Sequence, residues 1–302
     1  MRGNGHQPSR PDQPSAAAPD DAARAEATAA LGRRKTPWPL VVVALLFVIV
    51  PFLSWYGTTF LRPLDDEKIE EFLNDREKPR RVQHALEQID KRIEAGDEGV
   101  RRWYPRVIAL AAHPSADVRM TAAWVMGDDN RSEEFRATLR ALVGDHEPAV
   151  RRMAALSLSR FNDQSARPEL GAMLRPYELR ASAAGQVMTM LPAGSAVRRE
   201  SLIARVRDEA GNLGEVRSPL TGRVENVVAG EGANVAAGGA LCSLAPDAEN
   251  VLQSLRALML VGGGEDLPEI ERYARGVEGM PGDVQKQAAL TAGAIKSRAG
   301  KT

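Results

Sequence analysis

The longest run of apolar positions lies near the start of the chain. Residues 36–61 contain no charged side chain, and residues 40–53 are apolar on every face of a helix. A helix that crosses a bilayer needs about 20 such residues, and aromatic side chains are typical of its two ends, where Trp38 and Trp55 lie. The pattern predicts a transmembrane helix over residues 37–61, with a buried globular helix or a cleaved signal peptide as the alternatives.

The residues on either side of this run predict an orientation. Residues 1–36 have almost no large apolar side chain, which predicts a disordered tail. Arg33, Arg34 and Lys35 directly precede the run, and acidic residues soon follow it. Because positive charge is enriched on the cytoplasmic side, we expect a single-pass membrane protein with a cytoplasmic amino terminus and periplasmic or otherwise extracytoplasmic C-terminal domains.

Beyond residue 62 the apolar positions follow helical spacing, and the pattern repeats itself. Residues 118–127 (VRMTAAWVMG) match residues 150–159 (VRRMAALSLS) 32 positions later, and turn-forming residues precede both segments. Periodicity of this length predicts stacked helical hairpins. Weaker copies of the pattern occur over residues 67–93 and 282–289.

The repeated unit resembles a HEAT repeat of the short bacterial type. The family signature, a turn residue followed by Val-Arg and paired alanines, occurs as residues 117–123 and again as residues 148–155. The resemblance covers about half of the chain. It implies a helical solenoid, and such solenoids offer an extended surface for binding another protein.

Residues 178–246 interrupt the helical pattern. Proline and glycine recur there, and β-branched residues alternate with polar ones. The segment also contains a duplication, because residues 185–187 (GQV) align with 222–224 (GRV), and residues 191–197 align with 228–235. Two similar halves made of short strands predict a pseudo-symmetric sandwich of two small sheets.

This segment resembles the biotinyl/lipoyl barrel-sandwich family, most closely over residues 216–241. The resemblance implies that Gly232 and Gly238 lie at turns that need a positive φ or a close approach of the backbone. The carrier lysine of the family would fall on Gly211, and the whole segment between Lys91 and Lys286 contains no lysine. The resemblance therefore implies a module that carries neither biotin nor lipoate.

Two alternative functions follow from these resemblances. Barrel-sandwich modules occur in periplasmic adaptor proteins of efflux and secretion systems, which are also anchored by one N-terminal span. Some HEAT-like proteins are bilin lyases, enzymes that attach bilin chromophores to phycobiliproteins. The first alternative predicts a transporter-bound species, and the second predicts a bound tetrapyrrole.

The composition offers little material for a chemical site. Lys and Arg number 40, as do Asp and Glu, and this balance excludes a strongly basic nucleic-acid footprint. One cysteine excludes an intramolecular disulfide and a cysteine-based zinc cluster. The four histidines are widely separated, so a histidine-rich metal site is not expected.

The residues that could carry chemistry have simpler structural interpretations. His113 and His146 occupy near-equivalent repeat positions, and we expect polar turn residues there rather than a paired metal or acid–base site. Cys242 lies in an alternating strand pattern and is predicted to be a buried, unreactive thiol. His6 and His84 are isolated.

Other conspicuous residues are also interpreted structurally. Residues 262–264 (GGG) lack the Lys-Ser/Thr of a phosphate loop, so we expect a loop between helices. Trp103, Tyr104 and Trp124 are predicted to lie in the core of the repeats rather than in a ligand cage. We expect three basic pairs to be solvated faces that could rim a partner surface: Arg101–Arg102, Arg151–Arg152 and Arg198–Arg199.

Together these patterns predict an α+β membrane-anchored protein and a non-catalytic scaffold or adaptor. The expected segments are a tail (1–36), a transmembrane helix (37–61), helical repeats (62–177), a β sandwich (178–246) and a C-terminal helical hairpin (247–300). We expect no catalytic, cofactor-binding or metal-binding residue and no nucleic-acid partner. The expected partner is another, unidentified protein, and self-association is left open.

Overall fold

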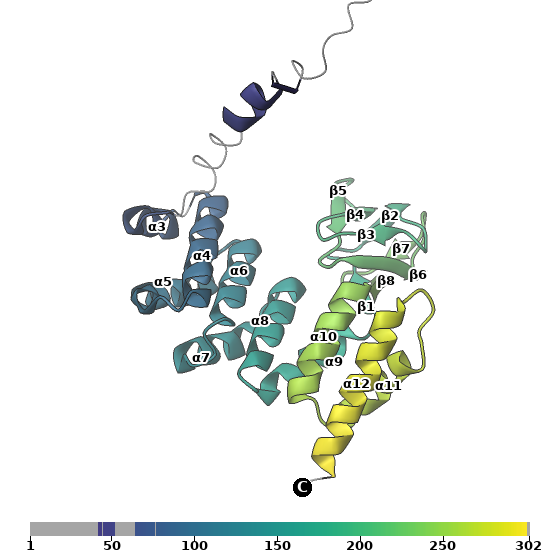
Figure 1. Cartoon of the computed structure of the whole chain (residues 1–302). Coiled ribbons are helices and arrows are strands. Elements are labelled where there is room, and N and C mark those ends of the chain that lie inside the picture. The colour runs from purple at the N-terminus through teal and green to yellow at the C-terminus, as the bar shows by residue number, and fades with distance from the viewer. Residues whose placement is uncertain (1–41, 44, 52–63, 76, 301–302) are drawn as a thin grey trace, which may run out of the picture. The chain divides into compact units, whose positions relative to one another are not determined.

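A computed structural model describes residues 42–43, 45–51, 64–75 and 77–300 of the chain (Figure 1). The chain divides into two units, residues 1–62 and 63–302. In the first unit, residues 42–43 and 45–51 are helical. The predicted tail over residues 1–36 lies outside the described residues.

The predicted membrane localisation is wrong. Much of the predicted span, residues 37–61, lies outside the described residues, and its longest described helical stretch is residues 45–51. Throughout the described part of the chain, no helix is both long and apolar enough to cross a membrane.

The second unit contains helical hairpins. Its α-helices are α3 (Asp66–Leu73), α4 (Pro79–Glu94), α5 (Tyr104–Ala109), α6 (Ala116–Met126), α7 (Glu133–Leu142), α8 (Pro148–Arg160), α9 (Arg167–Met173), α10 (Ala248–Val261), α11 (Leu267–Ala274) and α12 (Gly282–Ala299). Short 3₁₀ helices are η1 (Glu98–Trp103), η2 (Leu110–Ala112), η3 (Gln164–Ala166) and η4 (Gly264–Asp266). Each odd-numbered α-helix up to α11 contacts the following even-numbered one, which makes a repeat of an A helix and a B helix.

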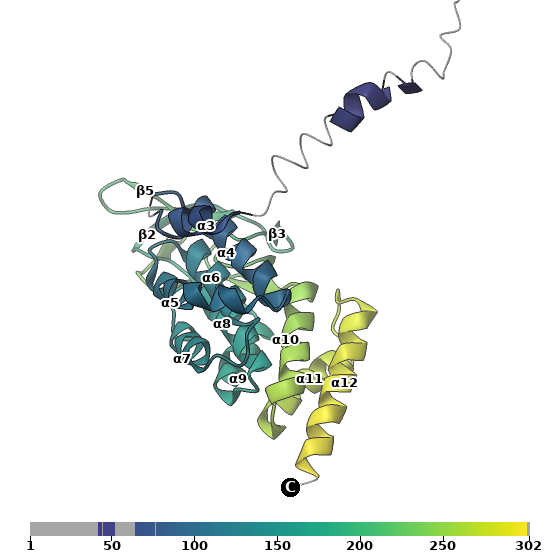
Figure 2. The ribbon, with the colours of Figure 1, turned by 60° about the vertical axis from the view of Figure 1, so that its left-hand side comes forward.

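The B helices α4, α6, α8, α10 and α12 each pack against the next, and the two views agree on this order (Figure 1, Figure 2). Ala122 and Ala123 of α6 and Ala154 and Ala155 of α8 are fully buried. Because these side chains are small, neighbouring B helices approach closely, and their larger apolar neighbours form one continuous core. The stacked helical hairpins predicted from the 32-residue repeat are confirmed.

The β segment is inserted inside a repeat. Its strands lie between α9, an A helix, and α10, the B helix that packs against it. In the two preceding repeats, only the short stretches 113–115 and 143–147 separate the A part from the B helix. The insertion therefore occupies an intra-repeat turn, which leaves α9 and α10 free to continue the stack.

The inserted segment forms two antiparallel sheets. Its strands are β1 (Tyr177–Arg180), β2 (Gly185–Met190), β3 (Ala196–Val197), β4 (Leu202–Arg207), β5 (Leu213–Arg217), β6 (Gly222–Val227), β7 (Asn234–Val235) and β8 (Ala240–Pro246). The strand orders are β1-β8-β6-β3 and β5-β4-β2-β7. One apolar core contains buried residues from both sheets, including Val187 and Val224. The predicted pair of small sheets is confirmed.

The duplicated glycines occupy equivalent positions in the two sheets. Gly185 opens β2 and Gly222 opens β6, and a Cβ atom on either would overlap a carbonyl oxygen of the paired strand, that of Arg207 or Ala245. Only glycine therefore permits the observed strand spacing at these positions. The φ angles of Gly232 (+84°) and Gly238 (+74°) place both in the left-handed region, as expected of these turns.

Candidate functional site

Two arginines repeat the same hydrogen bonds at an offset of 32 residues. Nη1 of Arg119 donates to the carbonyl oxygens of residues 113 and 114 at 2.8 and 3.1 Å. Nη1 of Arg151 donates to those of residues 145 and 146 at 2.9 and 3.2 Å. Each B helix is thus tied to the turn that precedes it, so consecutive B helices present equivalent faces.

On these equivalent faces, four side chains form what we call the docking face: Thr121 and Trp124 of α6 and Met153 and Leu156 of α8. All four are only half-buried, and each α6 residue corresponds to an α8 residue 32 positions later. Within each helix they are three residues apart, so they lie on one side. Because α6 packs against α8, the docking face is a continuous and mainly apolar strip.

The docking face corrects one prediction from the sequence. Trp103 and Tyr104 are buried, as expected of repeat core, but Trp124 is only partly buried where it packs against that core. Helical spacing in the repeat could have indicated this exposure, because Trp124 and its equivalent Leu156 lie on the side of the helix away from the buried alanine pairs. Sequence alone could not show that the described elements leave Trp124 and Leu156 only partly covered.

A basic cleft adjoins the docking face. It has a volume of about 510 Å³ and lies between the first turns of α4 and α6. We call it the basic cleft, and its lining residues are Lys78, Pro79, Arg80, Arg81, Gln83, Ser115 and Asp117. Nε2 of Gln83 donates to Oγ1 of Thr121 at 3.4 Å, so the cleft is continuous with the docking face.

The β segment reaches the edge of this cleft. Arg199, between β3 and β4, forms an ion pair with the carboxylate of Asp117 on α6. The guanidinium of Arg199 also lies 3.8 Å from a carboxylate oxygen of Glu200. The β sandwich is thereby held against the second repeat, although it is inserted in the fourth.

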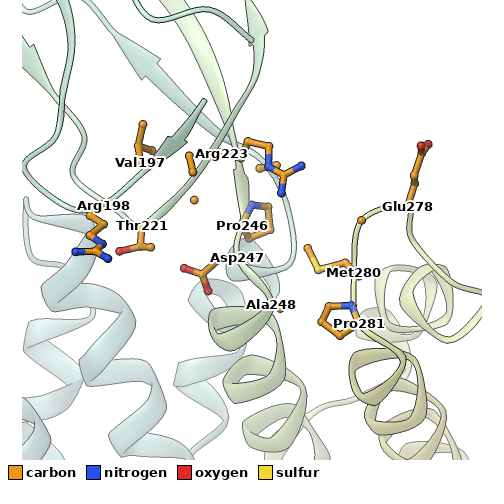
Figure 3. Close-up of a pocket in the computed structure, with 14 residues that line it drawn as sticks. Val197, Arg198, Thr221, Arg223, Pro246, Asp247, Ala248, Glu278, Met280 and Pro281 are labelled. Atoms are coloured by element: carbon orange, nitrogen blue, oxygen red, sulfur yellow. The ribbon is translucent and has the colours of Figure 1, made fainter. Parts of the chain in front are cut away.

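A second cavity, the seam pocket, lies where the β sandwich meets the last two repeats (Figure 3). Its volume is about 470 Å³, and its walls come from β3, β6 and β8, from the start of α10 and from the loop before α12. Met280 faces Pro246 across it, Asp247 points toward the side of Thr221, and Glu278 points away (Figure 3). The walls are mainly apolar, and the charged residues among those that line the pocket are Arg198, Arg223, Asp247 and Glu278.

The residues that line the seam pocket suit binding better than covalent chemistry. Of the usual nucleophiles and bases, the lining includes Thr221, Asp247 and Glu278, but no Ser, Cys, Lys, His or Tyr. Asp247 is engaged as the N-cap of α10, where its carboxylate accepts bonds from the backbone N–H and the side-chain amide of Asn250 at 2.8 and 2.9 Å. Its carboxylate therefore stabilises the helix at the pocket wall.

The two histidines singled out from the sequence occupy turns. Nδ1 of His113 accepts a hydrogen bond from the backbone N–H of Ser115 at 3.0 Å, and burial lowers the pKa of His113. The side chain of His146 is 75% exposed, and Nη2 of Arg119 lies 3.3 Å from its Nε2. Among the residues that the structure describes, no group of three or more His, Cys, Asp or Glu side chains could hold a metal ion.

Cys242 lies in β8 and is fully buried, as predicted. Burial raises the pKa of its thiol to about 11. A thiol with this pKa is almost entirely protonated at neutral pH, and only the thiolate is a strong nucleophile. Cys242 is thus part of the sandwich core.

The predicted solvation of the basic pairs holds only in part. Arg101, Arg102 and Arg198 are exposed. Arg152, by contrast, is 6% exposed, and its Nε atom has no hydrogen-bond partner. Its nearest carboxylate oxygen, from Glu169, is 3.8 Å away, and burial lowers the pKa of the guanidinium. The sequence does not reveal this burial, because it depends on how other elements, α9 among them, pack against α8.

The loop predicted over residues 262–264 is confirmed, since these glycines lie between α10 and α11 at the end of one helix and the start of η4.

Comparisons with known proteins agree with the helical part of this description. Residues 104–189 match the family of HEAT repeats, from α5 into β2. The comparison with curated proteins finds no match. Among solved structures, a match is the protein described as "Structure and function of a single-chain, multi-domain long-chain acyl-coa carboxylase". It is 18% identical with a TM-score of 0.23, and the match covers 33% of this chain and 11% of that chain.

Proposed function

We propose that this protein is a non-catalytic scaffold that holds another protein on its docking face. HEAT repeats are typical of protein-interaction scaffolds, and the match over residues 104–189 includes both helices of the docking face. The observation that carries the proposal is the partly exposed Trp124 on α6, which packs against the helix that carries the partly exposed Met153 and Leu156. Tryptophan is enriched among the residues that dominate binding energy at interfaces.

The apolar character of the docking face supports a protein partner. Methionine adapts its shape to different apolar surfaces, and a mainly apolar strip with one aromatic side chain suits the apolar side of an amphipathic segment. Of the four residues of the docking face, three have no nucleophilic or acid–base group. The fourth, Thr121, has a hydroxyl, which accepts the hydrogen bond from Gln83.

We further propose that the β sandwich is a lysine-less relative of the biotinyl/lipoyl modules and serves as a second contact surface. Its support is the pair of four-stranded sheets and the position of Gly211 in the turn between β4 and β5, with φ at +88°. That turn is where the resemblance places the carrier lysine. The segment boundaries expected from the sequence, 62–177, 178–246 and 247–300, remain part of this proposal.

The proposal is tested by comparing proteins captured from a lysate of the source cells by the full chain and by variants. The test variants are Trp124→Ala and Leu156→Asp, and the control is Leu290→Asp on α12, where Leu290 is 64% exposed and apolar. We expect one or more proteins to be enriched by the natural chain and by the control, and to be depleted at least tenfold with both test variants. Circular dichroism establishes that each variant is folded.

Enrichment that is unchanged by both folded test variants would overturn the proposal. Equal depletion with Leu290→Asp would do so as well, because the capture would then respond to any exposed charge rather than to the docking face.

A further inference from the structure

The basic cleft holds uncompensated positive charge. Lys78 and Arg80 are exposed, and neither forms an ion pair with any residue that the structure describes. Arg81 is different, because its Nη1 lies 3.6 Å from a carboxylate oxygen of Glu71 and 3.3 Å from one of Asp75. The acidic residue that lines the cleft, Asp117, is neutralised by Arg199 from the β sandwich, so the cleft retains the charges of Lys78 and Arg80.

These positive charges lie at the N-terminal end of α4, where positive charge is unfavourable. Arg80 and Arg81 lie in the first turn of α4, which contains no acidic residue, and Lys78 precedes it. The N-terminal end of a helix carries partial positive charge, so cations there are electrostatically unfavourable. Natural proteins keep such locally unfavourable arrangements mostly where they serve function. A carboxylate bound in the cleft would offset the repulsion between Lys78 and Arg80 and the repulsion between these cations and the N-terminal end of α4.

The cleft also has room and a hydrogen-bond donor for such a group. Its volume of about 510 Å³ accommodates several side chains. Ser115 precedes α6 without making a side-chain capping bond, so its hydroxyl can donate into the cleft. The cleft continues into the docking face through the bond from Gln83 to Thr121. One extended or helical segment can therefore contact both surfaces.

We propose that the basic cleft binds an acidic segment of the partner protein, whose Asp or Glu side chains pair with Lys78 and Arg80 while its apolar side chains lie on the docking face. This inference rests on the proposed scaffold function and adds the charge of the partner. An acidic protein segment fits better than a nucleic acid for two reasons. Tight duplex binding uses about 6–10 phosphate contacts, far more than two cations supply, and the adjoining surface is apolar.

Fluorescence anisotropy with labelled peptides tests the proposal on the full chain. The probes are an eight-residue glutamate peptide, an eight-residue lysine peptide and an eight-nucleotide oligothymidylate, all at low ionic strength. We expect the glutamate peptide to bind, to weaken as salt is added and to bind at least tenfold more weakly to the double variant Lys78→Glu/Arg80→Glu. The matched control is Lys91→Glu, an exposed site near the other end of α4, which should change the affinity less than twofold.

Three results would overturn the inference: no binding of the glutamate peptide, equal weakening by Lys91→Glu, or tighter binding of the oligothymidylate than of the peptide. The capture experiment separates this failure from failure of the scaffold function. If Trp124→Ala releases a captured protein and Lys78→Glu/Arg80→Glu does not, the docking face binds a partner that is not acidic. If Trp124→Ala has no effect, the scaffold function itself fails, whatever the peptides do.

Discussion

The guanidinium of Arg119, on α6, forms a bidentate ion pair with the carboxylate of Asp145, which lies in the turn between α7 and α8. Nε donates to Oδ2 at 2.8 Å and Nη2 to Oδ1 at 2.9 Å, and the two side chains are only 6% and 7% exposed. Burial alone would raise the pKa of Asp145, but the bonds from Arg119 and from the backbone N–H of Glu147 outweigh it and lower that pKa. The pair therefore couples two consecutive repeats.

Removal of one partner of this buried pair should strongly destabilise the fold. Arg119→Ala leaves the Asp145 carboxylate buried without its countercharge, and we expect the free energy of unfolding to fall by about 3–5 kcal/mol. Urea denaturation followed by circular dichroism measures this change. As a control, Arg81→Ala removes a more exposed pair and should cost about 0–1 kcal/mol.

The double variant Arg119→Met/Asp145→Leu distinguishes the ion pair from simple loss of volume. It should be markedly more stable than Arg119→Ala, because no buried charge is left alone. A double variant as unstable as the single one would show that the packing of Arg119, rather than its charge, holds the repeats together.

Protonation of Asp163 should lower the stability of the protein at acid pH. Burial would raise the pKa of Asp163, but hydrogen bonds from Arg136, from the backbone and hydroxyl of Ser165, and from Arg140 hold the pKa well below its ordinary value. Stabilisation from a lowered pKa is present above the ordinary value of about 4 and is lost as pH falls through the folded-state pKa. Asp163→Asn should therefore cost about 1–3 kcal/mol at neutral pH, and the difference should shrink below about pH 4.

Urea denaturation from neutral to acid pH tests this expectation. Glu134→Gln, on the exposed side of the helix that carries Arg136, removes a charge without this network. A constant difference between Asp163→Asn and the natural chain across the pH range would contradict the ionic origin.

The pKa of Asp90 is shifted in the opposite direction from that of Asp163. Asp90 is 3% exposed, its Oδ1 atom has no hydrogen-bond partner, and burial raises its pKa. Because the folded state then binds the proton more tightly, stability declines as pH rises from the ordinary value through the raised one. Asp90→Asn should raise the free energy of unfolding at neutral pH by on the order of 1 kcal/mol, since a buried charge is replaced by a neutral group.

The gain from Asp90→Asn should vanish at low pH, where the aspartic acid is already neutral. The matched control is Glu94→Gln, exposed at the end of the same helix, which should leave stability unchanged within about 0.5 kcal/mol. Thermal denaturation at two pH values measures both variants, and a stabilisation that persists at low pH would point to a cause other than charge.

The duplicated glycines of the sandwich should not tolerate a side chain. In Gly185→Ala or Gly222→Ala the new Cβ atom meets a backbone carbonyl oxygen of the adjoining strand, and relief requires the strands to separate. We expect each to destabilise the sandwich by about 1–3 kcal/mol. Gly230→Ala is the control, because its new Cβ atom would meet no neighbour within 4 Å and its φ is not in the left-handed region. Amide hydrogen exchange in β2, β4, β6 and β8 reports the change locally, and protection equal to that of the control would contradict it.

Local patterns in the sequence were enough to predict the helical hairpins and the paired sheets. Ala122–Ala123 and Ala154–Ala155 recur at a fixed offset, and helical periodicity depends on neighbours within one or two turns. The membrane localisation, which was inferred from the apolar run, its aromatic ends and the flanking charges, is wrong: no helix in the described part of the chain is long and apolar enough to cross a membrane. The place of the β insertion inside a repeat was not predicted, since it depends on α9 pairing with α10 across more than 70 intervening residues.

The sequence by itself determined which segments form helices and strands and which positions of one repeat correspond to those of the next, because these properties follow from short-range sterics and from the period of apolar positions. Only the tertiary structure decided that Arg152 is buried while Trp124 is not, that Asp117 pairs with Arg199, and that Lys78 and Arg80 share an open cleft beside an apolar strip. Those outcomes depend on which surfaces meet when distant segments pack, and burial and charge pairing are properties of the packed chain rather than of any local stretch.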